Sequence, residues 1–253
     1  MKKKFKFITD PKVRSLVEAI RRIPEAAAAS PREQLHRFAQ YSLLSLEHSV
    51  GQLGECCPMA FSVDPVALAF RRIERPRGAP WLPGEDALLP TYLEAVKAAE
   101  PFEDLLTPVF AEMGVGDDGN GQHFTPSGLS AGMVRFLPLD HSDHMLDMCC
   151  GSGALMLAML QRKHREQGPE SLAAFTGKAV DLDPLCIALA ALQLIANQWV
   201  HGAYIGLVAL EVGDVIRRTG EIAMVSRVRD NWKSATAALA TDVPVAEAVG
   251  NEG

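Results

Sequence analysis

The stretch DMCCGSGALML, residues 147–157, decides the fold. Gly151 and Gly153 allow a tight turn and a close approach of the backbone to a ligand. Asp147 stands where a strand would end, and the run that begins at Ala154 would start a helix whose first N–H groups face that ligand. The stretch therefore predicts a strand, a cofactor-binding turn and a helix.

Other sites that glycines and cysteines can form are less well supported by this stretch. Zinc ligands are usually two to four residues apart with a second pair elsewhere, whereas Cys149 and Cys150 are adjacent and no suitably spaced pair follows. No partner base marks either thiol as catalytic, so both are expected to pack. A phosphate loop would need Gly-Lys-Ser/Thr, and a dinucleotide fingerprint would need a glycine where Met156 stands. We expect no metal, and a cofactor with an amino-acid end and a nucleoside end.

The segments after residue 140 alternate between apolar runs and stretches of helical length. The runs 144–148, 177–182 and 203–210 indicate strands, and the segments 153–167 and 184–199 indicate helices. Unbroken apolar strands that alternate with helices are typical of a parallel sheet covered on both faces. The fold class is therefore α/β, with a truncated Rossmann-like sheet.

Three aspartates follow the three expected strands. Asp147, Asp181 and Asp214 would share the edge at which open parallel sheets bind ligands. Asp181 could accept hydrogen bonds from both hydroxyls of a ribose, Leu182 could pack against an adenine, and Asp214 could accept from its amino group. Each aspartate alone is explained as well by a turn or a helix cap, but the ordered trio favours a ligand.

The first 120 residues have a different character. Residues 11–50 indicate two amphipathic helices with a break at Ser30-Pro31, and 91–100 and 102–113 indicate two more. The segments 74–90 and 114–121 are rich in Pro or Gly and indicate connectors. We therefore expect a helical N-terminal region at 1–120, a Rossmann-like domain at 121–230 and a flexible tail at 231–253.

Charge and cysteine content indicate which partners and which cellular location to expect. The formal charge is −6, yet residues 1–40 carry ten Lys/Arg against four Asp/Glu, and such a basic arm can attract nucleic acid or be only a solvated tail. Five cysteines with two adjacent pairs favour a reducing, cytoplasmic setting, and no signal peptide is expected. Residues 184–210 lack charge, but Gln193 and Asn197 indicate a buried helix rather than a membrane span.

In order along the chain, these motifs resemble those of S-adenosylmethionine-dependent adenine-N6 DNA methyltransferases, the N-6 DNA methylase family and in particular its type I modification-subunit type. The resemblance covers about residues 100–216 and implies a class I methyltransferase sheet. The segments that carry it are PFEDLLTPVFAEM (101–113), GQHFTPSGLSAGMV (121–134), LDMCCGSGALML (146–157), VDLDPLCIALAALQLIAN (180–197) and GDVI (213–216).

The resemblance implies a cofactor, S-adenosylmethionine or its product S-adenosylhomocysteine, and a set of residues that bind it. Those residues border the donor, hold its methionine end, and contact its ribose, adenine ring and adenine amino edge. In that order they are Phe124 and Thr125, then Asp147, Gly151 and Gly153, then Asp181, Leu182 and Asp214.

The family's catalytic motif, Asn/Asp-Pro-Pro-Tyr/Phe, is missing. It should follow a fourth strand, and its groups would bind the amine of a flipped adenine. The chain contains no Pro-Pro. The region 221–234, EIAMVSRVRDNWKS, offers only Asp230-Asn231-Trp232 as a weak substitute, so catalytic residues remain unknown and it is uncertain that the chain is an enzyme.

Three functions remain open. The first is an S-adenosylmethionine-binding protein of restriction-modification systems that does not methylate DNA alone and has a regulatory, anti-restriction or partner-dependent role. The second is an active, divergent DNA adenine-N6 methyltransferase, and the third is a DNA-binding or assembly module with a vestigial donor pocket. Because the expected sheet lacks its later strands, the first strand would have an unpaired edge unless the helical region or another protomer covers it. DNA and a second chain or a homodimer are therefore the expected partners, and a membrane is not.

Overall fold

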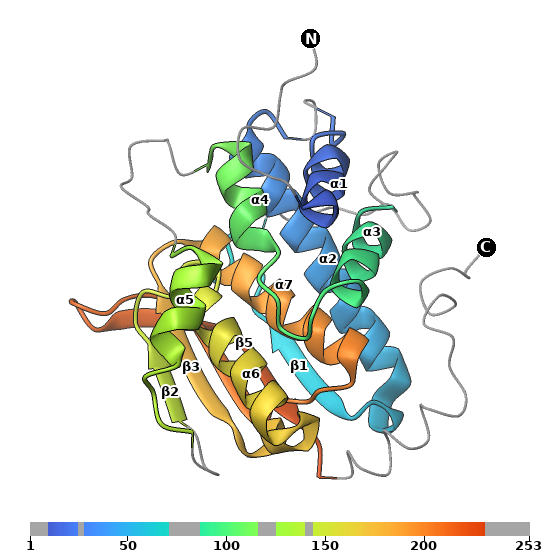
Figure 1. Ribbon diagram of the computed structural model, residues 1–253. Helices are drawn as coiled ribbons and strands as arrows, with labels where there is room; N and C mark the ends of the chain where they lie inside the picture. Colours follow the sequence, from blue (N-terminus) through green and yellow to red (C-terminus); the bar gives the residue numbers. More distant parts are fainter. Residues whose placement is uncertain (1–9, 25–27, 71–86, 116–124, 140–143, 231–253) are drawn as a thin grey trace.

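The computed structural model describes residues 10–24, 28–70, 87–115, 125–139 and 144–230 (Figure 1). It contains one open, mixed sheet of five strands in the order β1-β5-β4-β3-β2. Strands β2, β3 and β4 are parallel, while β5 pairs antiparallel with β4 and β1 antiparallel with β5. The α/β class and the truncated Rossmann-like sheet expected from the sequence are confirmed. The strands are β1 Met59–Val63, β2 His144–Asp147, β3 Thr176–Asp181, β4 Leu207–Asp214 and β5 Thr219–Val228.

The third expected strand is displaced toward the C-terminus. The run 203–210 was expected to be a strand, but β4 begins only at Leu207. Residues 203–206 form a connection that packs against the 3-10 helix Pro169–Ala174, where the Gly206 N–H donates to the Leu172 carbonyl at 2.9 Å. A Cβ on Gly206 would lie 2.4 Å from the Ala173 carbonyl oxygen, so this close approach requires glycine.

Most helices occur where the sequence predicts them. Two bounds differ, because α3 begins at Leu88, inside the expected connector 74–90, and α4 begins at Leu106 rather than at residue 102. Three helices begin in the same way. Asp10, Ser30 and Asp183 each precede a proline, and each side chain accepts a backbone N–H of the first helical turn. Proline fixes φ at a helical value and lacks the N–H that would be unsatisfied there. The helices are α1 Pro11–Ile20, α2 Pro31–Leu53, α3 Leu88–Lys97, α4 Leu106–Met113, α5 Ser127–Val134, α6 Ala154–Gln167 and α7 Pro184–His201.

Helices α6 and α7 pack on the same face of the sheet (Figure 1). A Cβ on Gly177 would meet Met156 of α6 at 3.1 Å, and Gln198 of α7 donates to the Ser226 hydroxyl at 3.3 Å. Gly177 and Ser226 are in register through Val208, so they lie on one face. Both crossovers from strand to parallel strand therefore pass over this face.

The opposite face of the sheet is exposed in the described part of the chain. Leu146, Lys178, Leu207 and Ile222 are exposed and face away from α6 and α7. The expectation of a sheet covered on both faces is therefore wrong for the described residues. The apolar strand runs that suggested it reflect burial against α7, which is buried over most of its length.

The N-terminal region shares its core with the sheet. Helix α2 packs along α7, and β1, which the sequence did not predict, pairs with β5 from Met59↔Val228 to Val63↔Met224. Buried apolar residues from α1 to α4 and from α6 and α7 form one continuous cluster. The boundary near residue 120 thus stays a prediction, and the tail at 231–253 lies outside the described residues.

Helix α7 is the one helix in the described ranges that is long and apolar enough to cross a membrane. In this fold, 78% of its 18-residue window is buried inside the protein. It is the central helix of the core, as the polar residues in its sequence indicated.

Candidate cofactor-binding site

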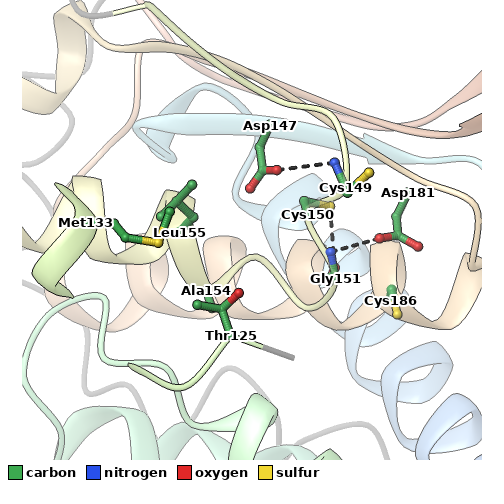
Figure 2. Close-up of a pocket in the computed structure, with 10 residues that line it drawn as sticks. All are labelled: Thr125, Met133, Asp147, Cys149, Cys150, Gly151, Ala154, Leu155, Asp181 and Cys186. Atoms are coloured by element: carbon green, nitrogen blue, oxygen red, sulfur yellow. Dashed lines mark hydrogen bonds between the residues drawn. The ribbon is translucent and has the colours of Figure 1, made fainter. Parts of the chain in front are cut away.

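A pocket lies at the carboxyl ends of β2 and β3, where the sequence predicted the cofactor turn (Figure 2). Its volume is about 230 Å³. Four of the predicted binding residues line it, namely Thr125, Asp147, Gly151 and Asp181. The complete lining is Thr125, Met133, Asp147, Cys149, Cys150, Gly151, Ala154, Leu155, Asp181 and Cys186.

The turn after β2 folds over the end of β3. Gly151 has φ 53°, a conformation that favours glycine, and its N–H donates to Asp181 Oδ2 at 2.8 Å. The Cys150 N–H donates to the Val180 carbonyl at 3.0 Å. Two bonds from consecutive residues thus hold the turn against the neighbouring strand and give Asp181 a structural role.

Two carboxylates meet at this pocket, one on each side of the turn (Figure 2). Burial raises the pKa of Asp147, and the negative charge of Asp181 raises it further. The Cys149 N–H, which donates to Asp147 Oδ1 at 3.3 Å, acts in the opposite direction. Because a partly buried carboxylate beside a second one is destabilised as an anion, the pocket is electrostatically suited to a ligand with positive charge.

Gly153 supports the turn without lining the pocket. It caps the N-terminus of α6 with φ 90°, and a Cβ there would lie 3.2 Å from the Ala190 Cβ of α7. Glycine is therefore required at position 153, both for the left-handed backbone conformation and for the close packing of α6 on α7. Direct contact between Gly153 and the methionine end of a donor stays a prediction.

Leu182 and Asp214, two further predicted residues, lie outside the pocket lining. Leu182 follows β3 and is 69% exposed. Asp214 Oδ1 accepts the N–H groups of Ile216 and Arg217 at 2.9 and 3.0 Å, so it forms the turn between β4 and β5. Phe124 lies outside the described residues. The contacts predicted for these three residues with the adenosine end stay predictions.

Sequence reasoning missed the apolar wall of the pocket. Met133 of α5 and Leu155 of α6 form it, opposite Asp181 (Figure 2). Both residues lie in motifs that the sequence had singled out, but no spacing rule brings two separate helices to one pocket. Only the packing of α5 against α6 does so.

Two of the pocket thiols, those of Cys150 and Cys186, are not activated. Burial raises the pKa of Cys150 and of Cys186, and nearby carboxylates raise each further, so both thiols stay protonated at neutral pH. Cys150 packs as predicted, whereas Cys149 is exposed and does not. Within the described ranges no three His, Cys, Asp or Glu side chains are grouped to hold a metal ion.

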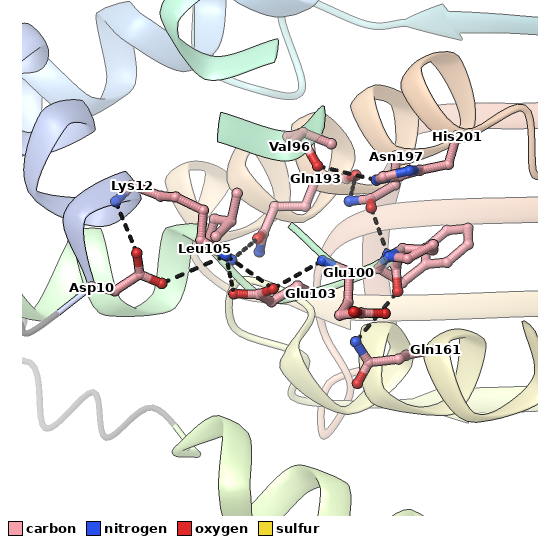
Figure 3. A network of polar contacts seen from close by, with 12 residues as sticks. Asp10, Lys12, Val96, Glu100, Glu103, Leu105, Gln161, Gln193, Asn197 and His201 are labelled. Atoms are coloured by element: carbon pink, nitrogen blue, oxygen red, sulfur yellow. Dashed lines mark hydrogen bonds and ion pairs between the residues drawn. The ribbon is translucent and has the colours of Figure 1, made fainter. Parts of the chain in front are cut away.

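A buried polar network lies beneath the turn and ties it to the segment before α4 (Figure 3). Gln193 donates to the Ser152 carbonyl at 2.9 Å and accepts the N–H groups of Leu105 and Leu106 at 2.9 and 3.0 Å. Asn197, one turn later on α7, accepts the Phe102 N–H at 2.6 Å. Gln193 and Asn197, two of the three side-chain amides of this apolar helix, thus satisfy a buried backbone segment.

The N-terminal helix α2 reaches the same region through an ion pair. Arg32 contacts Asp183 Oδ1 at 2.5 Å, and the Asp183 side chain is 6% exposed. The Asp183 N–H in turn donates to Asp181 Oδ1 at 2.9 Å. Arg32 and Asp183 therefore connect α2 with Asp181, the carboxylate that holds the turn.

The region after β4, where a fourth parallel strand was expected, forms the antiparallel strand β5 instead. Strand β5 folds back along β4 as a hairpin, with Thr219 opposite Asp214 and Arg227 opposite Leu207. Asp230 follows β5 and therefore lies toward the amino ends of the parallel strands, at the other end of the sheet from the pocket. The structure thus argues against Asp230 as a catalytic group, and Asn231 and Trp232 lie outside the described residues.

We expect the substitution Asp147→Asn to stabilise the protein in the absence of ligand. The pKa of Asp147 is raised on folding, so its carboxylate costs stability at neutral pH, and this cost disappears as the pH falls below the ordinary aspartate value of 3.8. Thermal unfolding should show a higher Tm than wild type at pH 7 and a shrinking difference toward pH 3.5. Asp64→Asn, in a turn after β1, is the control and should not raise the Tm.

We expect Gly153→Ala to lower the free energy of unfolding by about 1–3 kcal/mol, since alanine is strained at this φ. Gly132→Ala is the matched control because a Cβ there meets nothing within 4 Å inside α5. It should stabilise the protein by about 0.4–1 kcal/mol. Urea unfolding measures both, and equal effects would contradict the packing role of Gly153.

Comparison with known proteins adds one finding. Residues 102–219 match the family model of the N-6 DNA methylases. The matched range begins just before α4 and ends at the start of β5, so it contains the turn, both crossover helices and the pocket lining. No curated protein matches the chain. The match confirms the resemblance to the N-6 DNA methylase family, whereas the type I modification-subunit type stays a prediction.

Proposed function

We propose that the chain binds S-adenosylmethionine, or S-adenosylhomocysteine, in the pocket at the carboxyl ends of β2 and β3 and does not methylate DNA alone. The match of residues 102–219 to the family model of the N-6 DNA methylases supports this proposal. The observation that carries the proposal is the pair of carboxylates, Asp147 and Asp181, beside a glycine turn in this pocket. S-Adenosylmethionine has two cationic groups, the ammonium and the sulfonium, which such a pair stabilises.

The residues of the pocket suit the different parts of this donor. Thr125, Asp147 and Gly151 would hold the methionine end, with Gly153 shaping the turn. Asp181 already accepts two backbone N–H groups, one on each oxygen. Each oxygen has a second lone pair, which is available for a ribose hydroxyl.

The adenosine end would extend beyond the enclosed space. A volume of about 230 Å³ is below the roughly 300–1,000 Å³ of usual small-molecule sites. The exposed Leu182 follows β3 directly and would cover one face of the adenine. Asp214 would need to release its turn contacts, or use its second oxygen, to accept from the adenine amino group.

Methyl transfer needs more than a donor. When bound, S-adenosylmethionine supplies an electrophilic methyl group, and transfer requires an acceptor amine held in line with it. The chain has no Pro-Pro segment, and Asp230 lies at the other end of the sheet from the pocket. These features support a regulatory, anti-restriction or partner-dependent role in the cytoplasm, where the five free cysteines would stay reduced.

Titration calorimetry with S-adenosylmethionine tests the binding site. We expect a one-site isotherm for wild type and an affinity at least about 10-fold lower for Asp181→Ala, because hydrogen bonds to a charged group contribute about 1.5–3 kcal/mol. Asp64→Ala is the control, since Asp64 forms a comparable turn at the end of β1 and should bind as wild type does. No heat with wild type, or equal affinity of Asp181→Ala, would contradict the proposal.

Transfer of labelled methyl groups to DNA tests the second part. We expect no transfer by wild type alone, as with Gly151→Trp, in which a large side chain would fill the pocket. Transfer by wild type that Gly151→Trp abolishes would instead establish an active, divergent adenine methyltransferase.

A further inference from the structure

Helix α5, beside the candidate pocket, has little intrinsic stability. It has eight residues, Ser127–Val134, and two of them are the glycines Gly128 and Gly132. A helix of this length is marginal in isolation, and glycine inside a helix is unfavourable relative to alanine. The N-cap residue is Pro126, whose side chain cannot accept a hydrogen bond from the first turn. Contacts with other elements must therefore hold α5 in place.

Burial of apolar side chains contributes little to the position of α5. Its buried residues are Ser130 and Val134, whereas Leu129 is 57% and Met133 47% exposed. The main packing partner of α5 in the described part of the chain is α6. With one large apolar side chain buried, α5 depends on polar contacts with α6.

Arg162 of α6 supplies such contacts at the C-terminal end of α5. Its Nη1 donates to the Val134 carbonyl at 2.5 Å and to the carbonyl of Leu137, three residues further on, at 2.8 Å. The last carbonyls of a helix have no partner within that helix, and the helix dipole favours a cation beside them. The last turn of α5, AGMV (131–134), contains no basic residue. Arg162 thus caps α5 from the neighbouring helix.

A second side chain of α6 fixes the direction of this arginine. Glu166 accepts from Arg162 Nε at 2.9 Å and from Nη2 at 3.4 Å. The two residues have i,i+4 spacing, so they lie on one face of α6. Because the guanidinium is planar and rigid, this contact at two points leaves Nη1 directed toward α5.

The capped end of α5 is also an end that lines the pocket. Met133 directly precedes Val134 and forms the apolar wall with Leu155 of α6 (Figure 2). Thr125, two residues before α5, lines the same pocket. Arg162 follows Leu155 on α6, and the pocket lining formed by the described residues does not include it. Arg162 therefore sets the spacing of the α5 and α6 walls from outside the pocket.

We propose that Arg162 is a positioning residue of the donor site. By capping the C-terminus of α5, it holds Met133 and Thr125 at the pocket and raises the affinity for S-adenosylmethionine without contacting the donor. The inference rests on the proposed function and deepens it, because it assigns the placement of the pocket wall to one contact between α5 and α6. Without that contact, α5 would open locally and the wall opposite Asp181 would be lost.

Hydrogen exchange of the ligand-free chain, followed by mass spectrometry, tests the capping step. We expect Arg162→Met to speed exchange of the α5 amides at least about 10-fold, since two charge-assisted hydrogen bonds are lost. Arg162→Lys should restore part of the protection, because an ammonium can still donate to a carbonyl. Arg165→Met is the matched control, since Arg165 is exposed on the same helix and the change of charge is the same. Exchange of the α7 amides should stay as in wild type in all three variants.

Titration calorimetry with S-adenosylmethionine tests the link from α5 to the pocket. We expect Arg162→Met to bind at least about 10-fold more weakly than wild type, Arg162→Lys to lie between them, and Arg165→Met to bind as wild type does. Met133→Ala should also weaken binding. The double variant Arg162→Met/Met133→Ala should bind no more weakly than Arg162→Met alone, because residues that act through one contact are not additive.

Four results would overturn the inference. Unchanged α5 exchange in Arg162→Met would remove the capping step, and equal affinity of this variant and wild type would remove the positioning role. Additive losses in the double variant would mean that Arg162 affects binding by another route than the wall. Faster exchange of α7 together with α5 would mean a general loss of stability. No heat with wild type would instead contradict the proposed function, and the exchange result would be unaffected.

Discussion

The hydrogen bond from the Gly151 N–H to Asp181 Oδ2 is the interaction on which the site depends. It joins the turn after β2 to the end of β3, and it requires a backbone that glycine adopts readily. The carboxylates of Asp147 and Asp181 line one pocket beside this turn, where the charge of Asp181 helps to raise the pKa of Asp147. The geometry of the turn and the electrostatics of the pocket therefore have a common origin.

This arrangement illustrates a conflict between stability and ligand binding. A partly buried Asp147 carboxylate beside a second carboxylate lowers the stability of the ligand-free fold, and a cationic ligand would remove that cost. The polar network below the turn, built on Gln193 and Asn197, supplies compensating contacts, because it satisfies backbone groups that would otherwise be buried without partners. The stabilising hydrogen bonds of Gln193 lie beneath the turn, whereas the destabilised carboxylate of Asp147 lies at the pocket.

Local signals predicted most of the helices and the first two parallel strands. Asp10, Ser30 and Asp183, each ahead of a proline, indicate helix starts whatever the rest of the chain does. Strand β1 could not be predicted in this way, because its five residues form a strand only by pairing with β5, more than 150 residues later. The bare sheet face was missed for a related reason, since an apolar strand run does not reveal which of its faces a helix will cover. In the pocket, the motif residues were found but the apolar wall was not, because Met133 and Leu155 meet only through the packing of α5 on α6.

The ion pair between Arg32 and Asp183 has a mechanical consequence. Arg32 is in the first turn of α2, a helix of 23 residues whose far end leads toward β1, and Asp183 hydrogen-bonds to the carboxylate that holds the turn. A displacement of α2 would therefore be transmitted to the pocket, and by thermodynamic reciprocity occupancy of the pocket would restrain α2. The ion pair therefore couples the position of the N-terminal helix α2 to the candidate pocket.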